Sequence, residues 1–271
     1  MPKISIIISF YNEINFLRLV FAGLESQSFS GFEVIIADDG SGEEAVRHIK
    51  ALQKTASFPV KHVWQADKGF RKNRILNQSV LAAESPYLVF VDGDCILHKH
   101  FVGEHYRNRA KGVCLTGRRV NLSPELTRQL TPEKVANGYP EKLFWKLFFH
   151  SLQRDASYVE QAWYCRNPLL RRVLNHKKRG LLGSNFSLHK NDLLAINGFD
   201  ERYELPSIGE DTDIEFRLRL IGVKIRSLKN VAIQYHLSHP KQPRPKENIE
   251  LFNEIEASKV ACTPFGIKRQ K

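Results

Sequence analysis

The sequence lacks the features of several large classes of protein. No apolar run approaches the roughly 18 residues of a membrane span, and the short run at 4–8 has no small-residue cleavage site of the kind that ends a signal peptide. No GxGxxG motif follows this run and no GxxxxGK precedes a Ser or Thr, which argues against a dinucleotide-dependent oxidoreductase and a P-loop NTPase. The four cysteines have neither zinc nor disulfide-framework spacing: Cys95, Cys114, Cys165 and Cys262. We therefore expect a soluble protein in a reducing cytoplasm.

The composition is that of a basic globular protein. The 271 residues include 41 Lys and Arg against 29 Asp and Glu, a formal net charge of +12, and 42% are hydrophobic. This hydrophobic fraction is enough for a core and excludes an intrinsically disordered chain. The positive charge indicates an anionic partner: nucleic acid, an anionic membrane face or a phosphorylated substrate. The alternative is that the charge serves only solubility, and charge alone does not decide between them.

Four short apolar runs with helical periodicity between them predict an α/β fold. The runs are 4–9, 33–37, 60–64 and 87–91. Because they are short and do not alternate with polar residues, we expect strands that are buried on both faces. Apolar residues recur at spacings of three and four after each of the first three runs, at 16–24, 45–52 and 75–81. Alternating strands and helices predict βαβ units and a parallel sheet.

Acidic and aromatic residues follow each predicted strand: Tyr11, Asp38, Asp39, Asp67, Asp92 and Asp94. The carboxyl ends of parallel strands share one edge, where ligands bind, so we expect these side chains to converge on one crevice. Asp39 and Asp67 could accept hydrogen bonds from a base or a ribose, and Tyr11 could stack on a nucleobase. The alternative is that the carboxylates form turns or cap helices and that the tyrosine belongs to the core.

The pattern Asp92-Gly93-Asp94 directly follows a buried strand, which makes it more specific than the same pattern elsewhere. Carboxylates bind Mg2+ or Mn2+ through oxygen, and such a cation usually also carries substrate phosphates. The glycine lets the backbone approach the ligand. Basic residues near the start of the next helix could bind the same phosphates, or could form a solvated helix face: Lys68, Arg71, Lys72 and Arg74.

A second group of candidate residues lies in the C-terminal half. Glu210, Asp211 and Asp213 place three carboxylates before an apolar helical pattern. Like charges this close raise the pKa of at least one group, which suits a general base; the alternative is an acidic helix start favoured by the helix dipole. His236 follows a strand-like run, and together with His239 it is either a metal ligand or a structural histidine.

Taken in order, these motifs resemble those of family 2 glycosyltransferases with the GT-A fold. The residues that carry the resemblance are SFYNE at 9–13, DDGS at 38–41, GFRKNRILN at 69–77 and FVDGD at 90–94. The block 183–213 resembles the C-terminal part of β-1,4-galactosyltransferases and of chondroitin-polymerase-type transferases. The sequence departs from the family at Phe10, where a proline is usual. The QxxRW motif of processive synthases is absent, which argues against a polymerising enzyme.

The resemblance implies a role for each matched residue. It implies a UDP-linked sugar held by Phe10, Tyr11, Glu13, Asp39, Asp67, Arg71, Arg74, Asp92 and Gly93. Asp94 would bind a metal ion, Mn2+ or Mg2+, together with His236 and Asp92, and His239 is the alternative ligand. Asp211 would be the general base of an inverting transfer, and Glu210 would bind the acceptor sugar.

The resemblance also implies an architecture. We expect one GT-A domain over 1–240, with a single Rossmann-like, mostly parallel sheet flanked by helices. Its donor-binding half would be 1–110 and its acceptor-binding and catalytic half 111–240. A basic, Pro-rich tail at 241–271 would follow, with a short helix at 247–260.

The expected reaction adds one sugar to a glycan or glycolipid acceptor in cell-surface polysaccharide biosynthesis, such as a lipid-linked precursor or lipopolysaccharide. We expect no nucleic acid partner. One alternative is a nucleotidyltransferase, which would show an N-terminal Gly-rich phosphate loop that is missing here. The other is a non-catalytic polyanion-binding protein, which would bind nucleic acid tightly and in a salt-sensitive way.

Two segments within 138–179 could contact an anionic membrane at its cytoplasmic face. Apolar residues at 143–152 have helical spacing and basic neighbours, so this helix could lie in the interface; the alternative is a helix that covers the core or the acceptor cleft. The stretch 166–179 has six basic residues and no acidic ones. It could bind lipid headgroups or a phosphorylated acceptor, or it could be a solvated loop.

Overall fold

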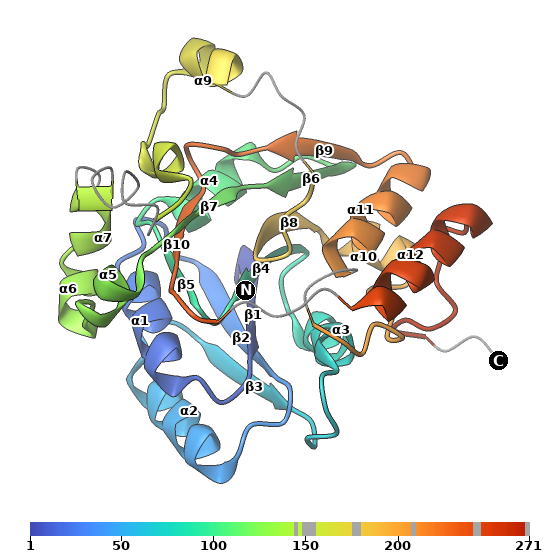
Figure 1. Cartoon of the computed structure of the whole chain (residues 1–271), viewed down its shortest axis with the longest axis horizontal. Coiled ribbons are helices and arrows are strands. Elements are labelled where there is room, and N and C mark those ends of the chain that lie inside the picture. The colour runs from blue at the N-terminus through green and yellow to red at the C-terminus, as the bar shows by residue number, and fades with distance from the viewer. Residues whose placement is uncertain (144–145, 148–155, 175–179, 207–209, 241–244, 269–271) are drawn as a thin grey trace.

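A seven-stranded mixed sheet lies at the centre of the protein in the computed structural model (Figure 1). The residues that the structure describes are 1–143, 146–147, 156–174, 180–206, 210–240 and 245–268. The strand order is β3-β2-β1-β4-β8-β6-β9. The first four strands of the chain are parallel to one another and lie where the apolar runs predict them: β1 (Ile4–Phe10), β2 (Phe32–Asp38), β3 (Val60–Trp64) and β4 (Tyr87–Asp92).

The rest of the sheet comes from the second half of the chain. Strand β8 (Asn185–His189) is antiparallel to β4 and to β6 (Val113–Thr116), while β9 (Lys224–Ser227) is parallel to β6. The predicted α/β fold with a mostly parallel sheet is therefore confirmed.

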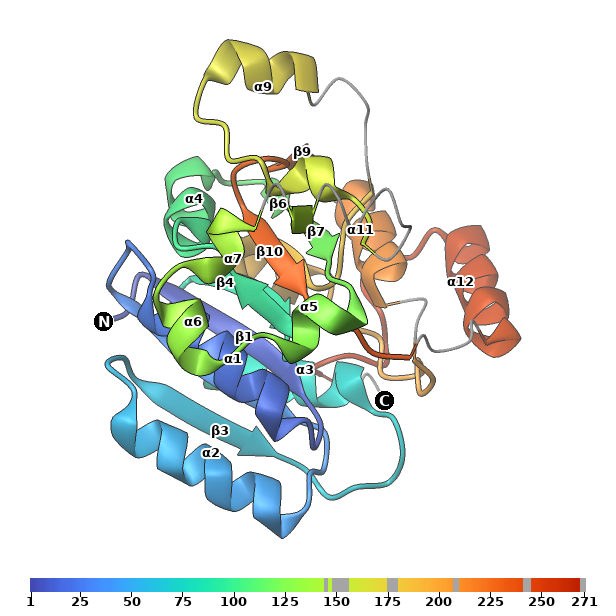
Figure 2. The same ribbon diagram turned by 60° about the vertical axis from the view of Figure 1, so that its left-hand side comes forward.

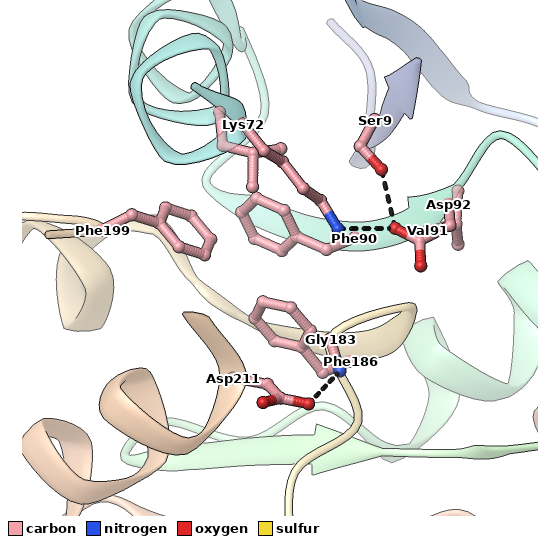
Figure 3. A pocket seen from close by; sticks show the side chains of 10 residues that line it. Ser9, Lys72, Phe90, Val91, Asp92, Gly183, Phe186, Phe199 and Asp211 are labelled. Atoms are coloured by element: carbon pink, nitrogen blue, oxygen red, sulfur yellow. Dashed lines mark hydrogen bonds and ion pairs between the residues drawn. The ribbon is translucent and has the colours of Figure 1, made fainter. Parts of the chain in front are cut away.

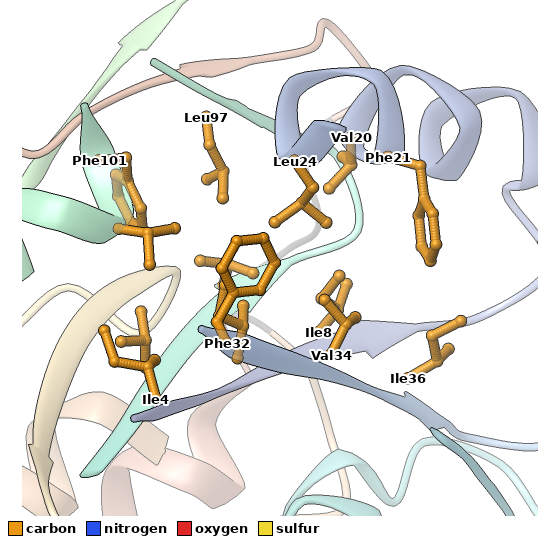
Figure 4. Packing of buried hydrophobic residues seen from close by; sticks show 14 of the residues in the cluster. Ile4, Ile8, Val20, Phe21, Leu24, Phe32, Val34, Ile36, Leu97 and Phe101 are labelled. Atoms are coloured by element: carbon orange, nitrogen blue, oxygen red, sulfur yellow. The ribbon is translucent and has the colours of Figure 1, made fainter. Parts of the chain in front are cut away.

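Helices cover both faces of the sheet because successive strand residues point to opposite sides. Ile6 and Ile8 of β1 belong to a cluster with α1 (Ile14–Glu25) and α2 (Glu43–Thr55), and Figure 4 shows the part formed with α1. Ile7 belongs to the opposite cluster, with α3 (Lys72–Ala82), α10 (Lys190–Ala195) and α11 (Glu210–Leu220). The helical spacings in the sequence correctly predict α1, α2 and α3.

The expectation that all four strands are buried is wrong for β3. Its first four residues are half-buried and Trp64 is exposed, whereas β1, β2 and β4 are almost wholly buried. The reason is its position, since β3 is the edge strand of the sheet and pairs only with β2.

A second, three-stranded sheet was not expected from the sequence. It has the order β5-β10-β7, formed by Cys95–Leu97, Ile233–His236 and Arg118–Asn121. Strand β10 is antiparallel to β5 and parallel to β7, and Figure 2 shows it with the short helices of the middle of the chain. Those elements are α4 (Phe101–Asn108), α5 (Pro124–Arg128), α6 (Pro132–Ala136), α7 (Tyr139–Lys142) and η1 (Val159–Ala162).

The segment 138–154 is only partly described, and its described apolar side chains are in the core. Leu143 and Leu147 are fully buried in the cluster under the second sheet, with Val120 and Tyr235. This packing agrees with the alternative of a helix that covers the core. The residues of the apolar stripe at 144–145 and 148–154 lie outside the described part of the chain.

The C-terminal segment packs on the body of the protein. Helix α12 (Lys246–Ser258) lies where a short helix is expected, and its Phe252 ring meets the ring of Phe216 on α11. Further on, Asn197 Nδ2 donates to the carbonyl of Thr263 at 2.7 Å and Thr263 Oγ1 donates to Asp200. No helix within the described ranges has both the length and the apolar character needed to cross a bilayer.

Candidate active site

The candidate site begins at the carboxyl edge of the parallel strands. In the register of the sheet, Ser9 lies opposite Asp92 and Phe10 lies opposite Asp38, so the loops that follow β1, β2 and β4 begin side by side. Two further backbone bonds hold these loops together: Gly93 N donates to Ser9 O and Asp39 N donates to Phe10 O. These three loops therefore share one edge of the sheet, as expected for parallel strands.

Tyr11, Asp39 and Asp67 form a polar corner at this edge, in which the aromatic side chain is exposed to solvent. Tyr11, which is half exposed, donates from Oη to Asp67 Oδ2 at 3.0 Å. Buried Asp39 accepts hydrogen bonds from Gln65 Nε2 at 2.6 Å and from the backbone N of Arg71 at 2.7 Å. Burial raises the pKa of Asp39 despite these two donors, and the hydrogen bond to Asp67 raises the pKa of Tyr11.

The other predicted donor-binding residues are placed differently. The side chain of Phe10 is 5% exposed and packs in the core, so only its backbone lies at the sheet edge. Glu13 and Arg74 are exposed at the starts of α1 and α3. The guanidinium of Arg71 donates to the carbonyl of Ala66. Of these residues, Arg71 acts on the corner through its charge, which favours the ionised form of Asp39 against the effect of burial on its pKa.

Asp38 takes the structural alternative. It is fully buried, accepts from the backbone N of Ser41 at 2.8 Å, and pairs with His62 Nε2 at 2.8 Å. It therefore stabilises the turn after β2 and is not open to a ligand.

A cluster of possible metal ligands lies where the two sheets meet. Oδ2 of Asp94 is 3.4 Å from His236 Nε2 and 3.0 Å from His239 Nε2, and the two nitrogens are 3.2 Å apart. The second sheet makes this arrangement, because His236 of β10 lies directly opposite Cys95 of β5. The carbonyl of Asp94 also accepts from the backbone N of Leu237.

Electrostatics favour charged groups in this cluster. Burial alone would raise the pKa of Asp94, but hydrogen bonds from His236 and His239 outweigh it and hold that pKa well below its usual range. The hydrogen bond to Asp94 raises the pKa of His239. The ring of His239 is oriented from its other side, since Nδ1 lies 2.9 Å from the carbonyl of Pro240.

The donor set fits a divalent cation. Two imidazole nitrogens and one carboxylate oxygen lie within 4.8 Å of one another, and first-row divalent metals accept this combination. The predicted ligands Asp94 and His236 are brought together, and His239, the alternative ligand, joins them. Asp92 is directed elsewhere, because its Oδ1 accepts from Ser9 Oγ at 2.7 Å and from Lys72 Nζ at 2.9 Å.

A pocket joins the two halves of the predicted site (Figure 3). Asp92 and Lys72 lie on one side, and Asp211 lies on the other, where its Oδ2 accepts from the backbone N of Gly183 at 3.2 Å. Aromatic rings form the apolar part of the pocket; those of Phe90 and Phe186 stack with centroids 4.6 Å apart. The residues that line the pocket are Ser9, Lys72, Leu76, Phe90, Val91, Asp92, Gly183, Phe186, Phe199 and Asp211.

The described carboxylates at the start of α11, Asp211 and Asp213, lie in different surroundings. Asp213 is fully buried and ion-paired with Arg217, whose Nε lies 2.9 Å from its Oδ2. Its pKa is raised chiefly by burial, and not by the crowding of acidic neighbours that the sequence suggested. Asp211 faces the pocket, while the side chain of Glu210 lies outside the described atoms.

Sequence reasoning missed several residues of the pocket. The sequence pattern does not distinguish Lys72 from the three neighbouring basic residues Lys68, Arg71 and Arg74. Phe186 and Phe199 lie within 183–213, but aromatic residues there also suit a core. Only the placement of β8 against β4 identifies Phe186 as a pocket residue, since Phe186 pairs with Phe90 in register.

Comparison with known proteins identifies the family. The family model described as glycosyl transferase family 2 matches residues 5–190. The chain belongs to this family. The resemblance found in the sequence is therefore confirmed, and with it the prediction of a glycosyltransferase at the level of the family.

Two curated relatives belong to different kinds of transferase. Chondroitin synthase of Escherichia coli is 28% identical over 254 residues, which is 90% of this chain and 35% of that protein. Validoxylamine A glucosyltransferase of Streptomyces hygroscopicus subsp. jinggangensis is 23% identical over 82% of this chain and 53% of its own length. The chain thus spans about a third and about half of these relatives.

Solved structures agree on the fold. TarS 1–349 of S. aureus in complex with UDP-GlcNAc matches with a TM-score of 0.60 at 18% identity, over 95% of this chain and 69% of that chain. The mannosyltransferase PcManGT from Pyrobaculum calidifontis, in complex with GDP-Man and Mn2+, matches with a TM-score of 0.57 at 14% identity, over 89% and 58%. These similarities confirm the predicted GT-A fold.

Proposed function

We propose that this protein is a metal-dependent, inverting glycosyltransferase that moves one sugar from a UDP-linked donor to a hydroxyl of a glycan or glycolipid. The observation that carries the proposal is the position of two acidic side chains, Asp92 and Asp211, on opposite sides of one pocket, with the cluster of Asp94, His236 and His239 following Asp92 along the chain. Cell-surface polysaccharide biosynthesis is the proposed context, supported by the similarity to chondroitin synthase.

The donor would lie along the carboxyl edge of the sheet. Tyr11, Asp39 and Asp67 form the polar corner for the nucleobase and ribose, which the open position of Tyr11 supports. Gly93 lets the turn after β4 pack against β1, because a Cβ there would lie 2.9 Å from Ser9 O, and we place the diphosphate beside this turn. Structures of TarS with UDP and with UDP-GlcNAc support UDP as the carrier.

Asp94, His236 and His239 would hold the metal. A bound Mn2+ supplies positive charge that stabilises the diphosphate leaving group without proton transfer. We favour Mn2+ over Mg2+ because Mg2+ prefers an all-oxygen ligand set, whereas this site offers two imidazoles. PcManGT, whose structure contains Mn2+, has the same fold.

Asp211 would act as the general base. Its carboxylate would take the proton of the acceptor hydroxyl as the hydroxyl oxygen forms a bond to the anomeric carbon and the bond to the diphosphate breaks. Attack on the face opposite the leaving group inverts the configuration. The hydrogen bond from Gly183 N to Oδ2 orients this carboxylate toward the pocket, and Glu210, one residue earlier, would contact the acceptor sugar.

This division of labour supports the two halves proposed for the domain 1–240. The nucleobase and ribose corner is built from residues before 110, Asp211, Gly183 and Phe186 come from the second half, and the metal cluster takes Asp94 from the first half and both histidines from the second. In this proposal the segment 241–271 is a tail that follows the domain. We further propose that the enzyme works in the cytoplasm, at the inner face of the cell membrane, where its acceptor is made.

The test is a panel of UDP-sugars with Mn2+ or Mg2+, read out as slow release of UDP by donor hydrolysis. We expect one sugar to be hydrolysed above the others, in a metal-dependent way. Asp94→Ala should abolish metal-dependent UDP binding in calorimetry, whereas Glu250→Ala, which removes an exposed carboxylate on α12, should leave it unchanged. Metal-independent binding of UDP by the unaltered protein, or full Mn2+-dependent binding by Asp94→Ala, would contradict the proposal.

A further inference from the structure

Helix α9 (Pro168–Leu174) stands apart from the rest of the protein. Figures 1 and 2 both show it at the outer end of the molecule, separated from the other labelled helices. It belongs to neither sheet and does not reach the candidate pocket. A helix in this position is available for contact with another molecule.

Apolar side chains on this helix face solvent. Leu169 is 75% exposed and Val173, four residues later on the same face, is 67% exposed, while Leu170 beside them is also exposed. Nearby, the exposed aromatic side chains of Tyr158 and Trp163 lie in the segment that leads to the helix. Grouped apolar exposure of this kind marks a site of interaction with another surface.

The charge of the same segment indicates which kind of surface it meets. Within the described residues 166–174 the sequence has three arginines, Arg166, Arg171 and Arg172, and no acidic residue. Arg166 is exposed at its start, where its guanidinium lies 5.5 Å from the centre of the Tyr164 ring. An apolar protein groove would match the leucines but not the charges, and a nucleic acid would match the charges but not the leucines. An anionic lipid surface matches both.

Hydrogen bonds at both ends of the segment tie it to the elements that carry the site. Before the helix, Cys165 N donates to the carbonyl of Asn230 at 2.8 Å, and Asn230 Nδ2 donates to the carbonyl of Trp163 at 3.0 Å. After it, Arg118 Nη2 donates to the carbonyl of Gly180 at 2.7 Å. Gly180 comes three residues before Gly183, which binds Asp211. Docking of α9 on another surface would therefore also position the body of the protein, including the pocket, against that surface.

We propose that α9 docks this protein on the surface of an anionic lipid bilayer, with Leu169, Leu170 and Val173 in the interface and Arg166 at the headgroups. If the protein docks in this way, its acceptor is a lipid-linked glycan at the bilayer surface. This consequence rests on the proposed transferase function. In this proposal α9 takes the docking role in place of the described part of 138–154, whose Leu143 and Leu147 are in the core.

The test is sedimentation of the full chain with vesicles of phosphatidylcholine, with and without phosphatidylglycerol. We expect binding to the mixed vesicles that weakens as salt is raised. Arg166→Gln should weaken the partition coefficient about fivefold, the effect of one basic residue near an anionic surface. Leu169→Ser combined with Val173→Ser should weaken it by tenfold or more, since each apolar side chain contributes on insertion.

Matched controls lie on the far part of the molecule. Leu81→Ser removes a leucine on α3 that is 59% exposed, and Arg47→Gln removes an exposed arginine on α2. Both should sediment like the unaltered protein. All four variants should keep its melting temperature and its Mn2+-dependent donor hydrolysis without vesicles, because none of these residues lines the pocket.

Three results would overturn the docking proposal. The first is that the protein does not sediment with mixed vesicles, and the second is that the control variants lose as much vesicle binding as the α9 variants. The third is a dimer in analytical ultracentrifugation that Leu169→Ser with Val173→Ser converts to a monomer, which would assign this face of α9 to a second copy of the chain. Donor hydrolysis in the absence of lipid separates this failure from that of the proposed function. Vesicle binding without donor hydrolysis would contradict the transferase proposal. Donor hydrolysis without vesicle binding would contradict only the docking proposal.

Discussion

Nζ of Lys72 lies 2.9 Å from Oδ1 of Asp92, inside the pocket that also contains Asp211. The ion pair joins the start of α3 to the end of β4, and Ser9 Oγ donates to the same carboxylate oxygen at 2.7 Å. The pocket therefore contains one cationic side chain, paired with Asp92, and a second carboxylate on the opposite side (Figure 3). The charge of this pocket depends on Lys72, because the next charged groups that line it are both acidic.

Replacing Lys72 should impair donor binding. Lys72→Met leaves Asp92 without its cationic partner, so its negative charge would repel the diphosphate of the donor. A hydrogen bond to a charged group contributes roughly 1.5 kcal/mol or more, so we expect the KM for the donor to rise about tenfold. Lys72→Arg should recover part of this loss, because it restores the charge. Steady-state kinetics provide the measurement, and an unchanged KM in Lys72→Met would refute the role.

Removing the proposed base should separate binding from catalysis. Asp211→Asn keeps the size of the side chain and an oxygen that can accept from Gly183 N, but it cannot take a proton. We expect Mn2+-dependent UDP binding to be retained and transfer to fall by about 10²- to 10⁴-fold. Glu250→Gln, at an exposed position on α12 outside the pocket lining, is a control for the loss of one negative charge. Normal turnover by Asp211→Asn would exclude Asp211 as the base.

The histidine cluster makes a separate prediction about metal. EDTA should abolish UDP binding and Mn2+ should restore it. His239→Ala should weaken Mn2+ binding by at least about tenfold, since even residues that only support a ligand have effects of that size. His48→Ala, an exposed histidine on α2, should not change it. Titration with Mn2+ followed by calorimetry measures the affinity, and equal affinities for His239→Ala and the unaltered protein would remove His239 from the ligand set.

The sequence predicts the first half of this site well because its signals are local. The run before Asp92 identifies β4, and the parallel arrangement then brings Tyr11, Asp39 and Asp67 to the same edge. Each of these inferences needs only a strand, its end and the residue that follows. Helix α3 is identified in the same way, from apolar spacing within eleven residues.

The rest of the site depends on pairings that no local pattern specifies. Strands β5, β7 and β10 have three or four residues each, too few for a clear period, and β5 and β10 are more than a hundred residues apart. The pairing of β5 with β10 brings His236 and His239 to Asp94. In the same way, the reach of Lys72 to Asp92 depends on how α3 lies against β4, which amphipathic spacing does not determine.

Acid should destabilise the protein through a buried histidine. Fully buried His105 lies with Nδ1 2.7 Å from Ser187 Oγ and Nε2 3.1 Å from Asn185 Oδ1, and burial lowers its pKa from 6.5 to about 4. Below pH 6.5 the unfolded chain binds a proton at this residue and the folded chain does not. Stability is therefore complete above pH 6.5 and is lost as the pH falls toward 4, by about 2 kcal/mol at pH 5.

Urea unfolding at pH 7 and pH 5 measures this loss. His105→Gln should reduce the difference between the two pH values by about 2 kcal/mol, because glutamine does not titrate. Part of the difference should remain, since burial also lowers the pKa of His98, to about 3. His48→Gln, at an exposed position, should behave like the unaltered protein. The same pH dependence in His105→Gln and the unaltered protein would contradict the assignment.

Gly40, in the turn after β2, leaves room for the corner formed by Tyr11, Asp39 and Asp67. Gly40 has φ +98°, and a Cβ at this position would lie 2.5 Å from Cα of Asp67, the residue that pairs with Tyr11. Gly222 has a similar φ of +82° but no atom near its Cβ position. Both substitutions to alanine strain the backbone by about 1 kcal/mol, and only Gly40→Ala also displaces Asp67, which adds roughly 1–3 kcal/mol.

The two variants therefore separate backbone strain from the loss of space. We expect Gly222→Ala to lower the free energy of unfolding slightly and to leave the KM for the donor unchanged. Gly40→Ala should lower it further and raise that KM, because Asp67 and Tyr11 move together away from the position in which they face the donor. If both variants showed the same KM, the contact between Gly40 and Asp67 would serve only the stability of the turn, and the corner would have to bind the donor without Asp67.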